Sequence, residues 1–177
     1  MNLKNRTLFL LAMMMMVAHS CGVYSFTGAS ISPDIKTISI LTFFNNAPLG
    51  PTNMSINFTE KIKDYYQQNT SLALVTNEGD LQIEGSIEDY TLNPIAASAS
   101  QDKNGIDLTS LTRITITVSV SYVNTQNNEY DFNNKSFSFF KDFDQTKDDL
   151  SSNEEEFVNE IFDQIILDIF NSSVANW

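Results

Sequence analysis

The chain has 177 residues, and its 22 acidic residues against 10 basic ones give a formal net charge of −12. A chain of this charge repels bare nucleic acid and anionic membrane surfaces, so we expect neither as a partner. The only cysteine, Cys21, and the only histidine, His19, both lie near the N-terminus. Because the remainder of the chain has neither cysteine nor histidine, it cannot form disulfides, zinc sites built on those residues, or a Ser-His-Asp triad.

The first 20 residues have the pattern of a secretory signal peptide. Lys4 and Arg6 precede the apolar run Leu8–Val17, which is shorter than the roughly 20 residues of a membrane-spanning helix. The next four residues, Ala18-His19-Ser20-Cys21, resemble the lipobox of bacterial lipoproteins, although Ala18 stands where a lipobox usually has leucine. Removal of this segment also takes away Lys4 and Arg6, which makes the net charge two units more negative.

The lipobox resemblance implies that the thiol of Cys21 carries a diacylglyceryl group and that cleavage before it exposes an amine, which is often acylated. Two or more acyl chains anchor a protein lastingly to a membrane. The alternative is ordinary secretion, with cleavage after Ser20 or nearby and a free thiol left over. We favour lipidation, because an unpaired cysteine is unusual in an oxidising compartment.

The sequence after the signal predicts one domain. We expect residues 21–35 to be a lipidated tether that ends in extended structure at Ser32-Pro33, and residues 36–177 to fold together. The predicted elements have the order β-α-β-β-β-β-α: strand Lys36–Phe44, helix Asn53–Gln68, strands Leu72–Val75, Leu81–Leu92, Leu111–Val123 and Tyr130–Phe143, and helix Ser152–Phe170. Asn93–Ser110 lacks periodicity and is expected to be a mobile loop, whereas Asn124–Glu129 is expected to be a hairpin loop.

The strand Leu111–Val123 has the cleanest alternation in the chain. Its even positions from Ile114 to Tyr122 are apolar and the odd positions between them are Thr or Ser, which predicts one buried face and one face of hydroxyls. In the strands on either side, the apolar residues change parity part of the way along. A change of parity requires one extra residue, so we predict β-bulges near Glu88-Asp89 and near Asn133–Lys135.

Both helices are amphipathic. The first, with Thr52 or Asn53 as its cap, has an apolar stripe of Phe58, Ile62, Tyr65 and Tyr66. The second begins with a predicted capping box of Ser151 and Glu154. Its apolar residues come in pairs every four residues: Phe157/Val158, Ile161/Phe162, Ile165/Ile166 and Ile169/Phe170. These pairs span about 220° against the roughly 100° that packing on one sheet needs, so the excess is either buried under loops or kept for a partner protein.

The order of elements predicts an α+β sandwich, with two helices packed on one face of a mostly antiparallel sheet of about four to five strands. Val174 and Trp177 are expected to cover the edge of the core.

Several stretches in this order resemble the LptE family of lipopolysaccharide-assembly outer-membrane lipoproteins. The resemblance extends over essentially the whole chain after the signal. The matching stretches are Cys21–Gly28, Phe44–Pro48, Phe58-Thr59-Glu60, Gly79–Gly85, Arg113–Val118 and Val174–Trp177.

The resemblance implies a non-enzymatic protein on the periplasmic face of the Gram-negative outer membrane. Members of the family sit in the lumen of the β-barrel LptD as plug and assembly partner, and the pair delivers lipopolysaccharide to the outer leaflet. Some members bind lipopolysaccharide through basic residues at one end of the sheet and its loop. Here that region offers Lys103 and Arg113 as candidate phosphate contacts, with pairing to nearby acids as the alternative. A domain this acidic attracts lipid phosphates weakly without bridging divalent cations.

The residues are also compatible with two other functional classes. One is a generic periplasmic accessory lipoprotein of a secretion or envelope-stress assembly. The other is an enzyme that uses paired carboxylates, either Glu84 and Glu88 or Asp142 and Asp144. Glu84 and Glu88 lie in a polar alternation typical of a solvent face, and the acids at 142, 144, 148 and 149 lack the spacing of a calcium loop. We therefore predict no catalytic residue, no metal and no cofactor apart from the lipid on Cys21.

Overall fold

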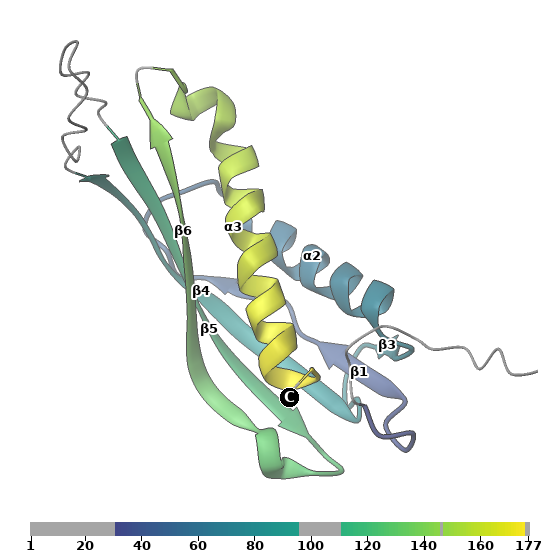
Figure 1. The fold of residues 1–177 in the computed structure, drawn as a ribbon. Coiled ribbons are helices and arrows are strands. Elements are labelled where there is room, and N and C mark those ends of the chain that lie inside the picture. The colour runs from purple at the N-terminus through teal and green to yellow at the C-terminus, as the bar shows by residue number, and fades with distance from the viewer. Residues whose placement is uncertain (1–30, 96–110, 146, 176–177) are drawn as a thin grey trace, which may run out of the picture.

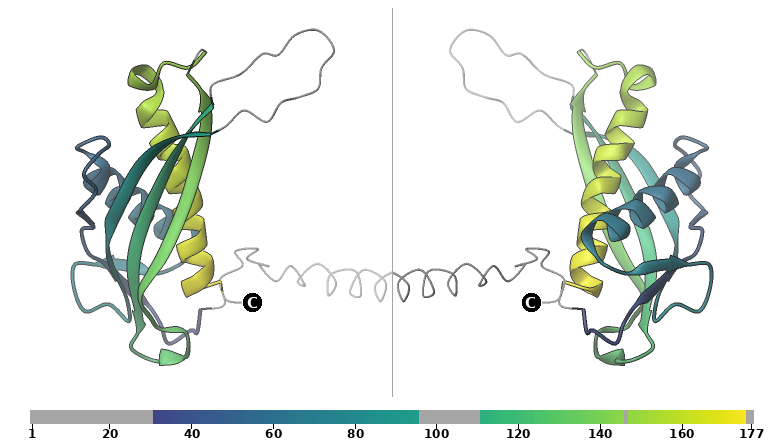
Figure 2. Two further views of the ribbon diagram at one scale, coloured as in Figure 1. Left: turned by 90° about the vertical axis from the view of Figure 1, so that its left-hand side faces the viewer. Right: turned by 90° about the vertical axis from the view of Figure 1, so that its right-hand side faces the viewer.

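Two helices cover one face of a six-stranded sheet in the computed structural model, which describes residues 31–95, 111–145 and 147–175 (Figure 1). The strands are β1 (Thr37–Ile40), β2 (Phe44–Asn45), β3 (Ala73–Val75), β4 (Leu81–Ile95), β5 (Leu111–Asn124) and β6 (Phe132–Asp144). The helices are α2 (Met54–Asn69) and α3 (Leu150–Ser173), and a short 3-10 helix, η1 (Asn128–Tyr130), lies in the β5–β6 connection. The two opposite views of Figure 2 show the sheet from its uncovered side and from the side of the helices.

The sheet is mixed, so the prediction of a mostly antiparallel sheet of four to five strands is wrong in these details. Its strand order is β3-β1-β4-β5-β6, with β2 also paired to β4. The pairs β1–β3, β1–β4 and β2–β4 are parallel, whereas the long pairs β4–β5 and β5–β6 are antiparallel. The α+β class and the placement of both helices on one face agree with the prediction.

The parallel half of the sheet follows from the shortness of its strands. Helix α2 connects β1 to β3 as a crossover, which is the usual connection between parallel strands. β3 has three residues, so residues 76–80 are long enough in extended form to return from its end to the start of β4. The sequence pattern alone did not indicate this return.

Both predicted β-bulges are present. The β4–β5 register shifts between Ile87 and Asp89. In the β5–β6 pair, Val120 lies opposite Lys135 and Tyr122 opposite Phe132, so β6 holds one extra residue there. Asn134 lies in that bulge with a φ of 49°, a left-handed conformation that asparagine tolerates better than most residues.

Several predicted boundaries were wrong. The strand expected at 36–44 is divided into β1 and β2, because its register against β4 shifts by one residue between Ile40 and Phe44. Phe43, which lies between the two strands, is fully buried. β4 continues to Ile95, and Tyr130 belongs to η1 instead of β6. The backbone near Ser32 forms a turn, in which the N–H of Ile35 donates to the Ser32 carbonyl at 3.0 Å. The rest of the predicted tether, the loop at 96–110 and Trp177 lie outside the described residues.

Helix α2 has the expected stripe. Phe58, Ile62 and Tyr66 are fully buried, and Tyr65 is half-buried. Asn53 occupies the N-cap position, although its side chain makes no capping hydrogen bond. The stripe faces the sheet and α3, and this packing stabilises a helix whose own N-terminus is weakly capped.

Helix α3 begins earlier than predicted, and its cap is Asp149 instead of Ser151. The Asp149 carboxylate accepts the Ser151 N–H at 3.4 Å and the hydroxyls of Ser151 and Ser152 at 2.6 and 2.8 Å. Glu154, the other half of the predicted capping box, accepts the Tyr90 hydroxyl at 2.7 Å instead. The capping box was therefore wrong, because the aspartate two residues upstream offers a charged acceptor to the same first turn.

The broad apolar arc of α3 is buried within the chain. All eight residues of the four predicted pairs are 8% exposed or less. One flank packs on β5 and β6, where the Phe143 and Phe157 rings lie 5.2 Å apart, and the other flank packs on α2. Neither alternative from the sequence was right as stated, since a second helix covers the excess instead of loops or a partner.

A chain of aromatic contacts joins the layers of this core. Phe58 of α2 stands edge-on to Phe43 at 4.8 Å between ring centroids and to Phe162 of α3 at 4.9 Å. Farther along the two helices, the Tyr66 hydroxyl bonds to the Ser173 hydroxyl at 2.6 Å. These contacts fix the two helices to each other and to the start of the sheet.

Close backbone packing explains the two glycines that begin and end the Gly79–Gly85 stretch. A Cβ at Gly79 would lie 2.5 Å from the Ser39 backbone nitrogen, and one at Gly85 would collide with the Ser119 carbonyl oxygen. Between them, one oxygen of Asp80 accepts three hydrogen bonds of 2.9 Å from Lys36 N–H, Thr37 N–H and the Thr37 hydroxyl. The stretch therefore helps to set the pairing of β4 with β1 at one end and with β5 at the other.

Candidate functional site

The structure places one of the three predicted site residues. Cys21, the predicted lipid-attachment residue, and Lys103, a predicted phosphate contact, lie outside the described residues. Arg113 lies on β5 opposite Asp142 of β6, on the sheet face away from the helices. Whether Cys21 is acylated and whether Lys103 and Arg113 contact phosphate remain predictions.

Arg113 is held by two neighbours. Its guanidinium donates to both carboxylate oxygens of Asp142, from Nε at 2.7 Å and from Nη2 at 2.8 Å, and lies 3.7 Å over the Phe140 ring. These hydrogen bonds hold the pKa of Asp142 below its usual range and raise the pKa of Arg113. Both side chains are about one-third exposed, so a ligand phosphate would compete with a formed ion pair.

Most carboxylates of the enzymatic and calcium alternatives have other partners within the domain. Glu84 is exposed, and Glu88 accepts hydrogen bonds from Asn46 and Ser86. Asp144 bonds to Lys147 at 3.0 Å, while Asp149 caps α3. Within residues 31–95, 111–145 and 147–175, no three acidic side chains come together in a group that would hold a metal ion.

The sheet surface opposite the helices is dominated by hydroxyls, and we call it the hydroxyl face. Its members on the three long strands are Ser86, Thr91, Thr115, Thr117, Ser119, Ser121, Ser136 and Ser138. Thr117 donates to Ser138 at 3.1 Å, and Ser121 donates to Asn133 at 2.9 Å. The Thr/Ser alternation of β5 predicted this face, and it remains uncovered by other described elements (Figure 2).

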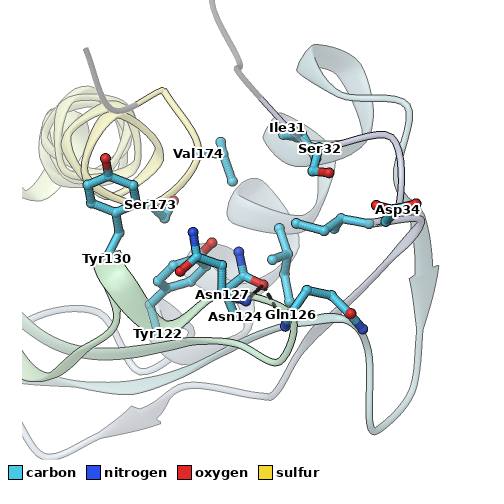
Figure 3. Close-up of a pocket in the computed structure, with 12 residues that line it drawn as sticks. Ile31, Ser32, Asp34, Tyr122, Asn124, Gln126, Asn127, Tyr130, Ser173 and Val174 are labelled. Carbon is cyan, nitrogen blue, oxygen red and sulfur yellow. Dashed lines mark hydrogen bonds between the residues drawn. The ribbon is translucent and has the colours of Figure 1, made fainter.

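A pocket of about 380 Å³ lies at one end of the domain, between the start of the described chain, the β5–β6 connection and the C-terminus of α3 (Figure 3). Its polar lining is Ser32, Asp34, Asn124, Gln126, Asn127 and Ser173, and it also has two tyrosines, Tyr122 and Tyr130. Its apolar lining is Ile31, Ile35, Leu81 and Val174. We call this the end pocket.

The end pocket has a rigid floor. The Asn124 side-chain oxygen accepts the backbone N–H groups of Gln126 and Asn127 at 3.0 and 3.2 Å, and Asn127 accepts that of Glu129 at 3.1 Å. Tyr122 is 2% exposed, and its burial, together with the charge of Asp131, raises its pKa to about 12. Sequence reasoning missed this pocket, because its walls come from three segments with no periodic signal in common.

The fold defines the class of protein, an α+β domain with two helices on one face of a mixed sheet. Solved structures share it at low identity. The hypothetical protein CT253 from Chlamydia trachomatis has a TM-score of 0.51 and 13% identity, covering 80% of this chain and 99% of its own. A putative neuraminyllactose-binding hemagglutinin homolog from Helicobacter pylori has a TM-score of 0.50 and 8% identity, covering 82% and 87%.

The sequence comparison identifies the family. The model of the LptE lipopolysaccharide-assembly family matches residues 35–173, so the chain belongs to the LptE family. This is a family of non-enzymatic lipoproteins of the Gram-negative outer membrane that act in lipopolysaccharide assembly. No curated protein matches the chain. Among the residues that the structure describes, neither helix is long and apolar enough to cross a membrane.

Proposed function

We propose that the chain is anchored in the outer membrane through a lipid on Cys21 and acts as plug and assembly partner of an LptD β-barrel. In this role it supports the transport of lipopolysaccharide and its insertion into the outer leaflet. The observation that carries the proposal is the LptE family match over residues 35–173. The lipobox-like segment before Cys21 supports the anchor.

The surface of the domain fits this role physically. The interior of a large outer-membrane β-barrel is polar, so a protein that fills it needs a polar surface. The apolar arcs of both helices are buried inside the chain, and the hydroxyl face is accessible and mostly polar, with the exposed rings of Phe44 and Phe140 among its hydroxyls. Contact with a barrel would then rest on hydrogen bonds and shape, and it would not require an exposed apolar patch.

Site-specific photocrosslinking tests the barrel partner. A photoreactive residue at Thr117, on the hydroxyl face, should yield a covalent product with a large outer-membrane barrel protein in intact cells. The matched control is Ile116, the neighbouring residue on the same strand, which is fully buried on the helix side. Recovery of a different envelope protein from Thr117 would favour the alternative of a generic accessory lipoprotein, and the absence of any product would contradict the plug.

Two further measurements separate the parts of the proposal. Mass spectrometry of the membrane-extracted protein should show an acylated Cys21, and Cys21→Ala should release the chain from the membrane fraction. Depletion should lower surface lipopolysaccharide and cause it to accumulate in the periplasm. Depletion without that defect would contradict the transport role while leaving the anchor standing.

A further inference from the structure

We propose that the end pocket binds an uncharged, hydroxyl-rich ring, namely a hexose-type saccharide unit. The proposal goes beyond the barrel partnership and does not depend on it. The pocket volume of about 380 Å³ lies within the usual range for small-ligand sites, roughly 300–1,000 Å³.

The charge of the pocket excludes phosphate-type ligands. None of the described residues that line it is basic, and Asp34 places a carboxylate at its exposed rim. Helix α3 ends at Ser173 in the pocket wall without a basic residue in its last turn, so the partial negative charge of the helix C-terminus faces the site. The Asp34 carboxylate and the helix C-terminus would both repel an anion, whereas they do not repel a neutral ligand.

The polar groups are suited to hydroxyls. Asn127 is oriented by the hydrogen bond from the Glu129 N–H to its side-chain oxygen, which leaves its amino group as a fixed donor. Figure 3 shows this amide beside Ser173 and Val174, with Tyr130 to one side. The Tyr122 hydroxyl is buried and hydrogen-bonded to the Asn124 side chain, so it helps to hold the floor of the pocket in place. Sugar hydroxyls can accept from a fixed amide donor, and a preformed site loses little entropy on binding.

The remaining walls suit the non-polar faces of a sugar ring. Tyr130 is 47% exposed and presents its aromatic ring at one end of the pocket. Ile31 and Val174 supply apolar surface to its lining. A flat ring with C–H groups on its faces and hydroxyls around its edge matches this arrangement better than an extended peptide, which needs an open groove.

NMR titration of the full-length protein in detergent tests the inference. The probes are glucose, glucose 6-phosphate and octyl β-glucoside below its micelle concentration. Glucose should shift backbone amide signals of residues 124–130 and 173–175, and glucose 6-phosphate should bind at least about fivefold more weakly because of its charge. Tyr130→Ala should weaken glucose binding about fivefold through loss of the ring contact. Ser32→Trp, which fills the pocket from its exposed rim, should abolish binding.

The control variant is Phe44→Ala, which removes a 73% exposed ring outside the pocket and should leave the affinity unchanged. Binding of both glucose and octyl β-glucoside by the wild-type protein supports recognition of the sugar ring, whether the ring is free or part of a glycolipid. Binding of octyl glucoside alone would show that the alkyl chain is recognised and would overturn the inference. The absence of any shift with glucose would overturn the inference, and so would equal glucose affinity in Ser32→Trp.

Discussion

The hydroxyls of Tyr66 and Ser173 join the ends of the two helices, and we expect substitution of the two residues to have unequal effects on stability. Tyr66 is fully buried, and its burial raises the pKa of its hydroxyl well above the ordinary value, so the group is a neutral donor. It bonds to the Ser173 oxygen at 2.6 Å, while the Ser173 hydroxyl bonds to the Ile169 carbonyl at 2.8 Å. Ser173 therefore has a second partner in its own helix, and Tyr66 depends on Ser173.

Ser173→Ala should destabilise the fold more than Tyr66→Phe does. The serine variant strands the buried Tyr66 hydroxyl, and an unsatisfied buried polar group costs about 1–3 kcal/mol. Tyr66→Phe removes the donor together with its bond, which costs about 0.5–1.5 kcal/mol and leaves Ser173 bonded to Ile169.

Urea unfolding of the two single variants and the double variant measures these differences at a constant m-value. The double variant should cost less than the sum of the singles, because no hydroxyl is stranded once both are gone. A larger cost for Tyr66→Phe than for Ser173→Ala, or full additivity in the double variant, would refute the reasoning.

Three further outcomes are expected. Hydrogen bonds lower the pKa of Asp80 in the folded protein, and the largest contribution comes from the Lys36 N–H. Their stabilising effect is complete above the pKa of an unfolded aspartate, about 3.9, and is lost as the pH falls through the lower pKa of the folded state. Asp80→Asn should flatten the acid side of the melting-temperature profile, and an unaltered profile would contradict this. Gly85→Ala should cost about 1–3 kcal/mol in urea unfolding, since its Cβ meets the Ser119 carbonyl; a neutral result would mean that β4 and β5 can separate locally. Phe44→Ala should stay within about 0.5 kcal/mol of wild type, because its ring is exposed, and a larger loss would show an unrecognised contact.

The sequence predicted features that depend on neighbours along the chain. The period of two in β5 placed Ile114 and Val118 toward the helices and Thr117 on the opposite face, as the structure shows. A change of parity is also local, so both bulges were predictable. The stripe of α2 follows from its period of 3.6 in the same way.

Features that depend on distant segments were not predictable in this way. The parallel pairing of β1 with β3 and β4 depends on a five-residue return that no periodicity encodes. The cap of α3 was misassigned because Asp149 and Ser151 both fit the local pattern, and Glu154, which would complete a capping box with Ser151, accepts the hydroxyl of Tyr90 from a remote strand instead. The end pocket is the extreme case, since Ile31, Asn127 and Val174 meet only in the folded chain.

The burial of the α3 arc changes the physical basis of the proposed partnership. A spare apolar stripe would have predicted a hydrophobic docking interface, but every residue of that arc is occupied inside the domain. What remains for a partner is an acidic outer surface and the hydroxyl face, which also carries the exposed rings of Phe44 and Phe140. Arg113 on that face is already paired with Asp142. A barrel lumen that received this domain would therefore have to offer hydrogen-bonding groups and net positive charge, and the association would weaken as salt screens that attraction.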